Sequence, residues 1–221
     1  MEWYHILAIV SAALCFTAFF VQAISLYRLG ISKDFSSRSG SIKKGVKYSF
    51  TKAMSPTQKE SAYKHLPTYT AGILFHIGIC ITLLYLVWMF IAIFADVYLP
   101  EILGQISIIV LAISSLCGIA ILLKRIIKKE LRYISSPDDY ISNILTTAAQ
   151  IATLNYICVT LCPSSGNTSC IVTLYFITLS LLLLWMPFGK TKHLLYFFSA
   201  RYHLGYFYGR RNSWPTNDSK K

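Results

Sequence analysis

The sequence predicts an all-α membrane protein with five transmembrane helices, and three observations support this fold class. Of the 221 residues, 55% are hydrophobic and only 14% are charged, which is typical of a membrane protein and not of a soluble domain. Several long segments contain no charged residue at all. Finally, every Lys and Arg falls in one of three regions that five spans would place on one side of the membrane.

The uncharged segments set the expected spans. About 20 apolar residues cross a bilayer at a rise of 1.5 Å per residue. The last segment is too long for a single helix, and a cluster of turn-forming residues at 162–167 divides it into 140–161 and 171–188. The first segment is expected to be a retained span, because its apolar run exceeds that of a signal peptide. The uncharged segments are residues 3–27, 67–95, 102–123 and 140–188.

The distribution of basic residues predicts the orientation of the chain. Residues 28–64 hold nine Lys and Arg, residues 124–132 hold five and residues 190–221 hold seven, which accounts for all 21. The opposite side carries acidic residues only. The positive-inside rule therefore places the amino terminus outside and the carboxyl terminus in the cytoplasm. The net charge of +12 is explained by this topology, so no nucleic-acid partner is expected. We expect residues 1–215 to form one domain, followed by a polar tail at 216–221.

Two histidines are the candidate functional residues. His76 lies within the uncharged segment 67–95, and a buried imidazole in a membrane helix requires a partner or a ligand. His193 follows the inner end of the fifth span, which we expect to bend at Pro187 and to continue along the inner interface. Two neutral imidazoles on facing helices commonly hold haem. The spacing leaves open that His76 bonds a neighbouring helix while His193 lies at the interface.

The remaining polar residues have simpler interpretations. His65 and His203 are the alternative haem ligands, although His65 precedes the expected helix start and His203 lies about 80° away from the face of His193. Residues 136–139, Ser-Pro-Asp-Asp, are typical of a helix N-terminus, so no catalytic role is assigned to the two carboxylates. Cys162 and Cys170 flank the predicted outer loop, and a disulfide between them is left open.

Four short motifs make the chain resemble a known family, the gamma subunit of respiratory nitrate reductase and the wider five-helix membrane cytochromes b. Its length and the loop 54–60 are most similar to the cytochrome b subunit of Hmc-type transmembrane redox complexes. The motifs are Leu74-Phe-His76-Ile-Gly78, Ser136-Pro-Asp-Asp-Tyr140, Pro187-Phe-Gly-Lys-Thr-Lys-His193 and the ending Arg201-Tyr-His-Leu-Gly-Tyr-Phe-Tyr-Gly-Arg-Arg211.

This resemblance implies a haem b electron-transfer subunit of an oxidoreductase complex in the cytoplasmic (inner) membrane. His76 and His193 match the pair that holds the haem nearer the cytoplasm. Leu86 and Tyr175 stand where the family pattern has a second pair, so one haem is expected. Electrons would pass between menaquinone, or a periplasmic cytochrome c partner, and a cytoplasmic iron–sulfur subunit, with other membrane subunits in the complex. The alternative is a haem-free membrane anchor of a redox or transport complex.

Overall fold

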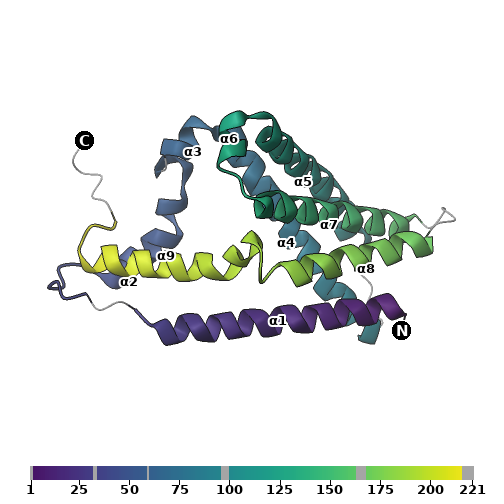
Figure 1. Cartoon of the computed structure of the whole chain (residues 1–221), viewed down its shortest axis with the longest axis horizontal. Helices are drawn as coiled ribbons and strands as arrows, with labels where there is room; N and C mark the ends of the chain where they lie inside the picture. Colours follow the sequence, from purple (N-terminus) through teal and green to yellow (C-terminus); the bar gives the residue numbers. More distant parts are fainter. Residues whose placement is uncertain (1, 32–33, 59, 96–99, 163–167, 216–221) are drawn as a thin grey trace. The chain divides into compact units, whose positions relative to one another are not determined.

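The computed structural model describes residues 2–31, 34–58, 60–95, 100–162 and 168–215. Within these ranges the chain is helical and contains no strand (Figure 1), which confirms the all-α fold class. The chain forms two compact units. The first unit comprises residues 1–17 and 67–191, and the second unit comprises residues 18–66 and 192–221. The predicted polar tail at 216–221 lies outside the described residues.

Five helices are long and apolar enough to cross a membrane, which confirms the predicted number of spans. Each begins and ends within a few residues of the uncharged segment that predicted it, because charged and turn-forming residues bound every segment. They are α1 (Trp3–Leu29), α4 (Leu66–Ala95), α5 (Glu101–Ile127), α7 (Pro137–Leu161) and α8 (Thr168–Trp185).

The expectation that the fifth span continues past Pro187 is wrong. Helix α8 ends at Trp185, the chain turns over residues 186–189, and after one 3-10 turn (Lys190–Lys192) a separate helix α9 (His193–Arg210) begins. A proline lacks the amide hydrogen that a continuing helix needs and disfavours helical geometry in the residue before it. The remaining short elements are α2 (Ile42–Phe50), the 3-10 turns Lys52–Met54 and Pro56–Gln58, α3 (Glu60–Lys64) and α6 (Lys129–Tyr133).

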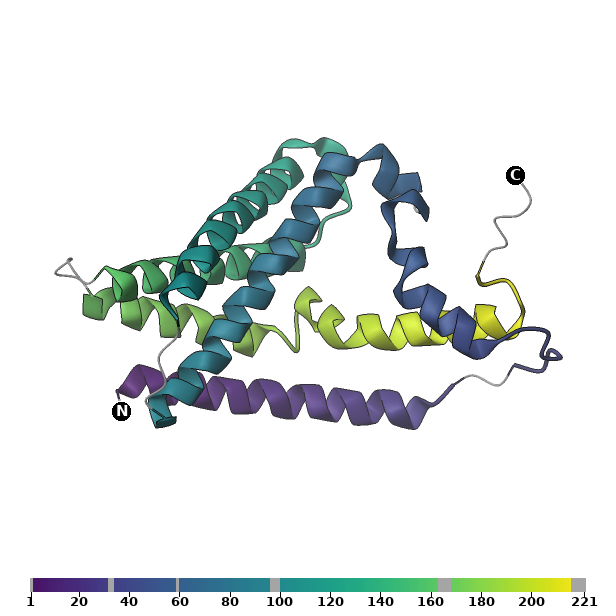
Figure 2. The same cartoon turned by 180° about the vertical axis from the view of Figure 1, so that it is seen from behind.

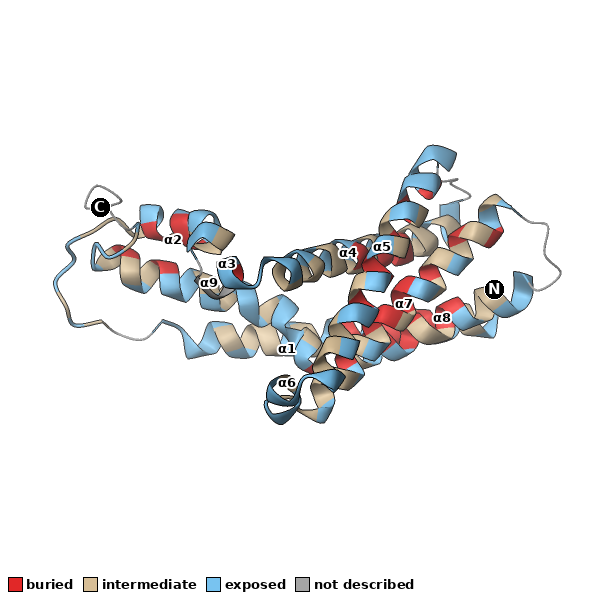
Figure 3. Cartoon of the chain, turned by 90° about the horizontal axis from the view of Figure 1, so that it is seen from above, coloured by how far each residue is buried: buried red, intermediate tan, exposed pale blue. Residues whose placement is uncertain are grey.

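The core of the first unit lies where α7 packs against α5 on one side and α8 on the other. Figure 3 shows buried residues on each of these three helices. Leu111 of α5, Ile157 of α7 and Leu179 of α8 are almost completely buried. The other faces of the long helices expose large apolar side chains, as expected for surfaces that lie against lipid.

In the second unit α2 packs closely on α9, and the two helices lie side by side in Figures 1 and 2. Glycines make this contact. A Cβ atom on Gly205 of α9 would lie 2.6 Å from the Cα of Val46 and 3.0 Å from the carbonyl oxygen of Gly45, both in α2. Close to this contact, Ser49 Oγ donates to the carbonyl oxygen of Arg201 (2.6 Å). Because backbone atoms form the seam, neither helix can yield to a larger residue.

An acidic residue holds the segment before α2 against the end of α9. The carboxylate of Asp34 accepts hydrogen bonds from Nε and Nη2 of Arg211 (3.2 and 3.1 Å) and from the backbone N–H of Ser36 (3.0 Å). The amides of Ser39 and Gly40 donate to the carbonyl oxygen of Arg210 (3.0 and 2.9 Å). The Arg211 guanidinium, followed by Ser36, holds the pKa of Asp34 well below its ordinary value of 3.8.

The glycine seam gives a first prediction. Gly205→Ala should lower the stability of the α2–α9 contact by about 1–3 kcal/mol, because the added methyl overlaps backbone atoms that cannot move. Gly72→Ala is the matched control, since a Cβ there meets nothing within 4 Å and alanine favours the helix. The measurement is the thermal unfolding midpoint of both variants. Equal midpoints would show that the seam is not closely packed in the protein.

The second prediction concerns pH. Because folding lowers the pKa of Asp34, its contacts stabilise the folded segment fully above the unfolded value of 3.8, and this contribution is lost as the pH falls through the lowered folded value. Hydrogen exchange at Ser39 and Gly40, corrected for intrinsic rates, should therefore be faster in Asp34→Asn than in wild type at pH above about 5. The difference should shrink only in stronger acid. Equal protection at neutral pH would contradict the prediction.

Candidate functional site

His76 projects from α4 with its side chain exposed at the surface of the first unit. Its Nδ1 lies 2.6 Å from the carbonyl oxygen of Gly72, one turn earlier. A carbonyl oxygen only accepts hydrogen bonds, so this contact places the proton on Nδ1 and the ring lone pair on Nε2. Histidine ligands of metals usually donate their other N–H to a carbonyl or carboxylate in the same way. The imidazole is therefore oriented and in the tautomer that suits ligation through Nε2.

A buried polar junction fixes the direction of His76. The carbonyl oxygen of Phe75 accepts a hydrogen bond from Nε2 of Gln150 on α7 (3.0 Å), and Ser114 Oγ on α5 donates to Gln150 Oε1 (2.7 Å). Gln150 and Ser114 are essentially inaccessible to solvent. Gly78 completes the junction, because a Cβ at that position would overlap the Ser114 side chain. His76 lies about 200° around the helix from Gly78, so its ring points away from α5 and α7.

The other candidate ligands belong to the second unit. His193 is the first residue of α9, His203 lies further along the same helix, and His65 precedes α4. All three side chains are exposed. Among the described residues, no three or more His, Cys, Asp or Glu side chains gather as they would around a metal ion. The pairing of His76 with His193 therefore stays a prediction, as does the choice of His193 over His65 and His203.

His5, near the start of α1, is in a different state from His76. Its Nδ1 accepts a hydrogen bond from the backbone N–H of Glu2 (3.1 Å), which places the proton on Nε2. The ring packs edge-on against Phe176 of α8, with centroids 4.7 Å apart, and beside Tyr4 at 4.5 Å. This histidine caps the start of its helix and packs between aromatic rings, as expected for a structural residue.

The two positions where the family pattern has a second pair of ligands are packed inside the first unit. Leu86 of α4 is 3% exposed and Tyr175 of α8 is completely buried. The Tyr175 ring stacks on Tyr156 of α7, with centroids 4.5 Å apart, and contacts Phe176 edge-on at 5.0 Å. Both side chains therefore contribute to the contacts between helices.

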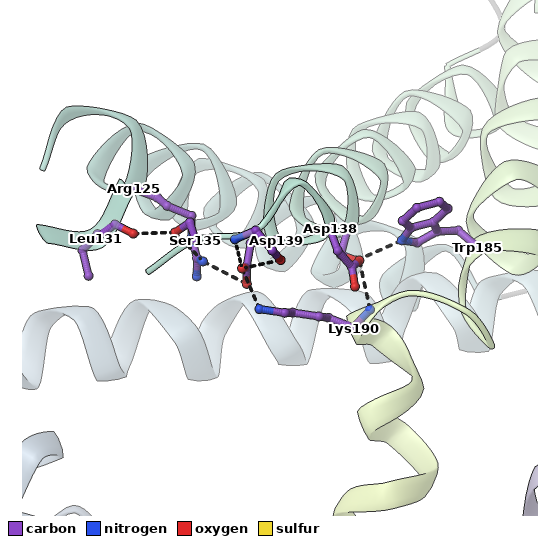
Figure 4. A network of polar contacts seen from close by, with 9 residues as sticks. Arg125, Leu131, Ser135, Asp138, Asp139, Trp185 and Lys190 are labelled. Atoms are coloured by element: carbon purple, nitrogen blue, oxygen red, sulfur yellow. Dashed lines mark hydrogen bonds and ion pairs between the residues drawn. The ribbon is translucent and has the colours of Figure 1, made fainter. Parts of the chain in front are cut away.

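A polar network at the start of α7, drawn in Figure 4, joins two motifs that are far apart in the sequence. The capping role predicted for Ser136 is confirmed: Ser136 is the N-cap residue of α7 and forms a capping box with Asp139, whose carboxylate accepts from the Ser136 backbone N–H (2.9 Å). The same carboxylate pairs with Arg125 of α5 (2.9 Å) and with Lys190 after α8 (2.6 Å). Asp138 accepts from the Lys190 backbone N–H (3.0 Å). The carboxylates thus do more than begin a helix, and local sequence reasoning missed this.

The turn after α8 is shaped by packing around Trp185. Its indole Nε1 donates to Ser142 Oγ on α7 (2.9 Å), and Gly189 lies so close to the indole that a Cβ there would overlap the ring. The turn thereby brings Lys190 to the two aspartates (Figure 4). At the other end of these helices, Cys162 and Cys170 are free thiols, so the structure contains no disulfide between them.

Comparison with protein-family models, with curated proteins and with solved structures found no match to this chain.

The network at the start of α7 predicts an energetic coupling between Asp139 and Lys190. In a double-mutant cycle with Asp139→Asn and Lys190→Gln, we expect a coupling of about 0.5–1 kcal/mol, since Lys190 is half exposed and solvent screens the pair. The cycle is measured by thermal unfolding of the purified protein. A parallel cycle with Lys192→Gln, whose side chain makes no ion pair within the described residues, should give no coupling. Equal coupling in both cycles would show only an effect of net charge.

Proposed function

We propose that this chain is a haem b-containing membrane subunit that transfers electrons within a respiratory redox complex. His76 carries the proposal. Its position within an apolar span, its bond to the Gly72 carbonyl and its direction away from α5 and α7 suit an imidazole that binds a group outside that helix bundle. The motifs shared with the five-helix membrane cytochromes b are the second support.

The donor chemistry of the chain fits one haem. In this proposal His76 and His193 would bind the haem iron, and imidazole is a common ligand of haem iron in proteins. When bound, the haem iron supplies one-electron redox chemistry. The protein binds and orients the group: the junction of Gln150 and Ser114 fixes the helix that carries His76. Leu86 and Tyr175 are packed against protein side chains, which supports one haem and not two.

The partners follow from the same proposal. Electrons would pass between menaquinone, or a periplasmic cytochrome c, and a cytoplasmic iron–sulfur subunit, with the chain embedded in the cytoplasmic membrane. One exposed basic surface could receive an acidic subunit. Helix α2 turns Gly45 toward α9, while Lys43, Lys44 and Lys47 on its other faces are exposed. Such a surface suits electrostatic attraction of a partner.

The proposal predicts a defined haem content. Purified wild-type protein should contain about one haem per chain, and His76→Ala and His193→Ala should each lose it, because removal of one axial ligand weakens binding and orientation. His65→Ala and His203→Ala are the matched controls and should retain the haem. The readouts are haem per polypeptide and the reduced-minus-oxidised absorption spectrum.

Each other outcome is informative. Two haems per chain would overturn the proposed number. Haem retained in His76→Ala or His193→Ala, but lost in a control, would overturn the ligand assignment. Folded wild-type protein that binds no haem under any condition would favour the haem-free membrane anchor instead.

A further inference from the structure

A groove in the second unit is formed by the last turns of α1 and the first half of α9. Figures 1 and 2 show the two helices running in the same direction there. The groove has a volume of about 850 Å³. The apolar residues that line it precede the polar ones in both helices. They are Ala23 and Leu26 of α1 and Leu195 and Phe198 of α9. The groove is therefore apolar toward the beginning of both helical segments.

The polar lining follows further along both helices. Tyr27 and Arg28 of α1 and Ser199, Tyr202 and His203 of α9 line the groove. None of these five side chains makes a hydrogen bond or an ion pair within the described residues. In the part of the chain that the structure describes, a cation, an imidazole and three hydroxyl groups thus line the polar part of the groove without a hydrogen-bond or ion-pair partner.

The state of Arg28 differs from that of three other arginines on the predicted cytoplasmic side. Arg125 pairs with Asp139, and both Arg210 and Arg211 pair with Asp34. Among the described side chains no such carboxylate pairs with Arg28, which is exposed at the end of a helix long and apolar enough to span a membrane. An arginine in this position favours a phosphate group, whose oxygens match its planar set of N–H donors.

The hydroxyl of Ser199 also differs from those of other serines in the long helices. Serines in the long helices commonly bond the carbonyl oxygen four residues earlier, as Ser25 does to Val21 (2.9 Å) and Ser180 to Phe176 (2.7 Å). Ser199 makes no such bond, so its hydroxyl is available to the groove. Several hydrogen-bond donors therefore lie together in the groove, beside its apolar lining.

We propose that this groove binds one anionic phospholipid. The phosphate lies against Arg28, Tyr202 and His203, and an acyl chain follows the apolar lining. The position favours a lipid because α1 is a membrane span and Arg28 lies where the span ends, at the depth of the headgroups. The charge of the surroundings favours an anionic lipid over a zwitterionic one. Residues 18–66 and 192–221 contain fifteen Lys and Arg but only three Asp and Glu. This excess of positive charge would repel the ammonium group of a zwitterionic headgroup. This inference goes beyond the proposed haem function and does not depend on it.

The test measures lipid binding and not electron transfer. Native mass spectrometry of the purified full chain, with equimolar phosphatidylglycerol and phosphatidylcholine of identical acyl chains, should show one phosphatidylglycerol per chain in preference to phosphatidylcholine. Arg28→Gln should weaken phosphatidylglycerol binding about fivefold, since one basic residue near the surface contributes about 1 kcal/mol. Arg132→Gln is the matched control: it removes the same charge from α6, outside the groove, and should leave binding unchanged.

Two further arms test the apolar part of the groove. Ala23→Trp places an indole in the groove and should displace the lipid while Arg28 is kept. Glycerol phosphate carries a phosphate ester without acyl chains and should fail to displace phosphatidylglycerol. Displacement by glycerol phosphate would instead identify a site for free phosphate esters. Equal binding of the two lipids, or equal weakening by Arg28→Gln and Arg132→Gln, would overturn the proposal.

Discussion

The hydrogen bond from the Gln150 amide to the carbonyl oxygen of Phe75 is the contact on which the first unit depends. Hydrocarbon offers no water to a buried amide, so this side chain must find its partners within the protein. It finds them on two other helices, the Phe75 carbonyl on α4 and Ser114 on α5. One residue thereby joins three spans. It also sets the rotation of α4, and so determines that His76 faces away from α5 and α7.

Acidic residues organise the polar ends of this basic chain. The sequence has 21 Lys and Arg but only nine Asp and Glu. Two of the aspartates each form ion pairs with two basic side chains. Asp139 pairs with Arg125 and Lys190 and joins the ends of α5, α7 and α8, whereas Asp34 pairs with Arg210 and Arg211 beside the start of α2. In each case the arginines and the lysine are held in place and neutralised locally. Arg28 and the lysines of α2 form no ion pair with any described residue, so they can attract anions from outside the chain.

The spans could be predicted from sequence because they depend on a one-dimensional property, the length of an uncharged segment. The contacts between spans could not, since Gln150 and Phe75, or Asp139 and Lys190, are far apart in the chain and nothing local links them. The residues near Pro187 were expected to decide where α8 ends, yet the expected continuation past Pro187 was wrong. The turn depends on Gly189 fitting beneath Trp185 and on Lys190 reaching the aspartates, which are contacts with α7. The position of His76 within a span was predictable, but its hydrogen bond to Gly72 was not.

Histidines in membrane helices are distinguished by their hydrogen bonds and not by their presence. His5 lies at the outer end of its span, where an interfacial role is expected from the sequence, whereas His76 lies well inside its own span. In the structure, His5 Nδ1 accepts a hydrogen bond from a backbone N–H, so Nε2 carries the ring hydrogen. His76 Nδ1 instead donates to a carbonyl, which leaves the lone pair on Nε2, the nitrogen furthest from the helix. Only the second arrangement gives the tautomer that can ligate a metal through Nε2. The backbone contacts with Glu2 and Gly72 therefore distinguish His5, a structural residue, from His76, a candidate ligand. A haem function is best tested at His76.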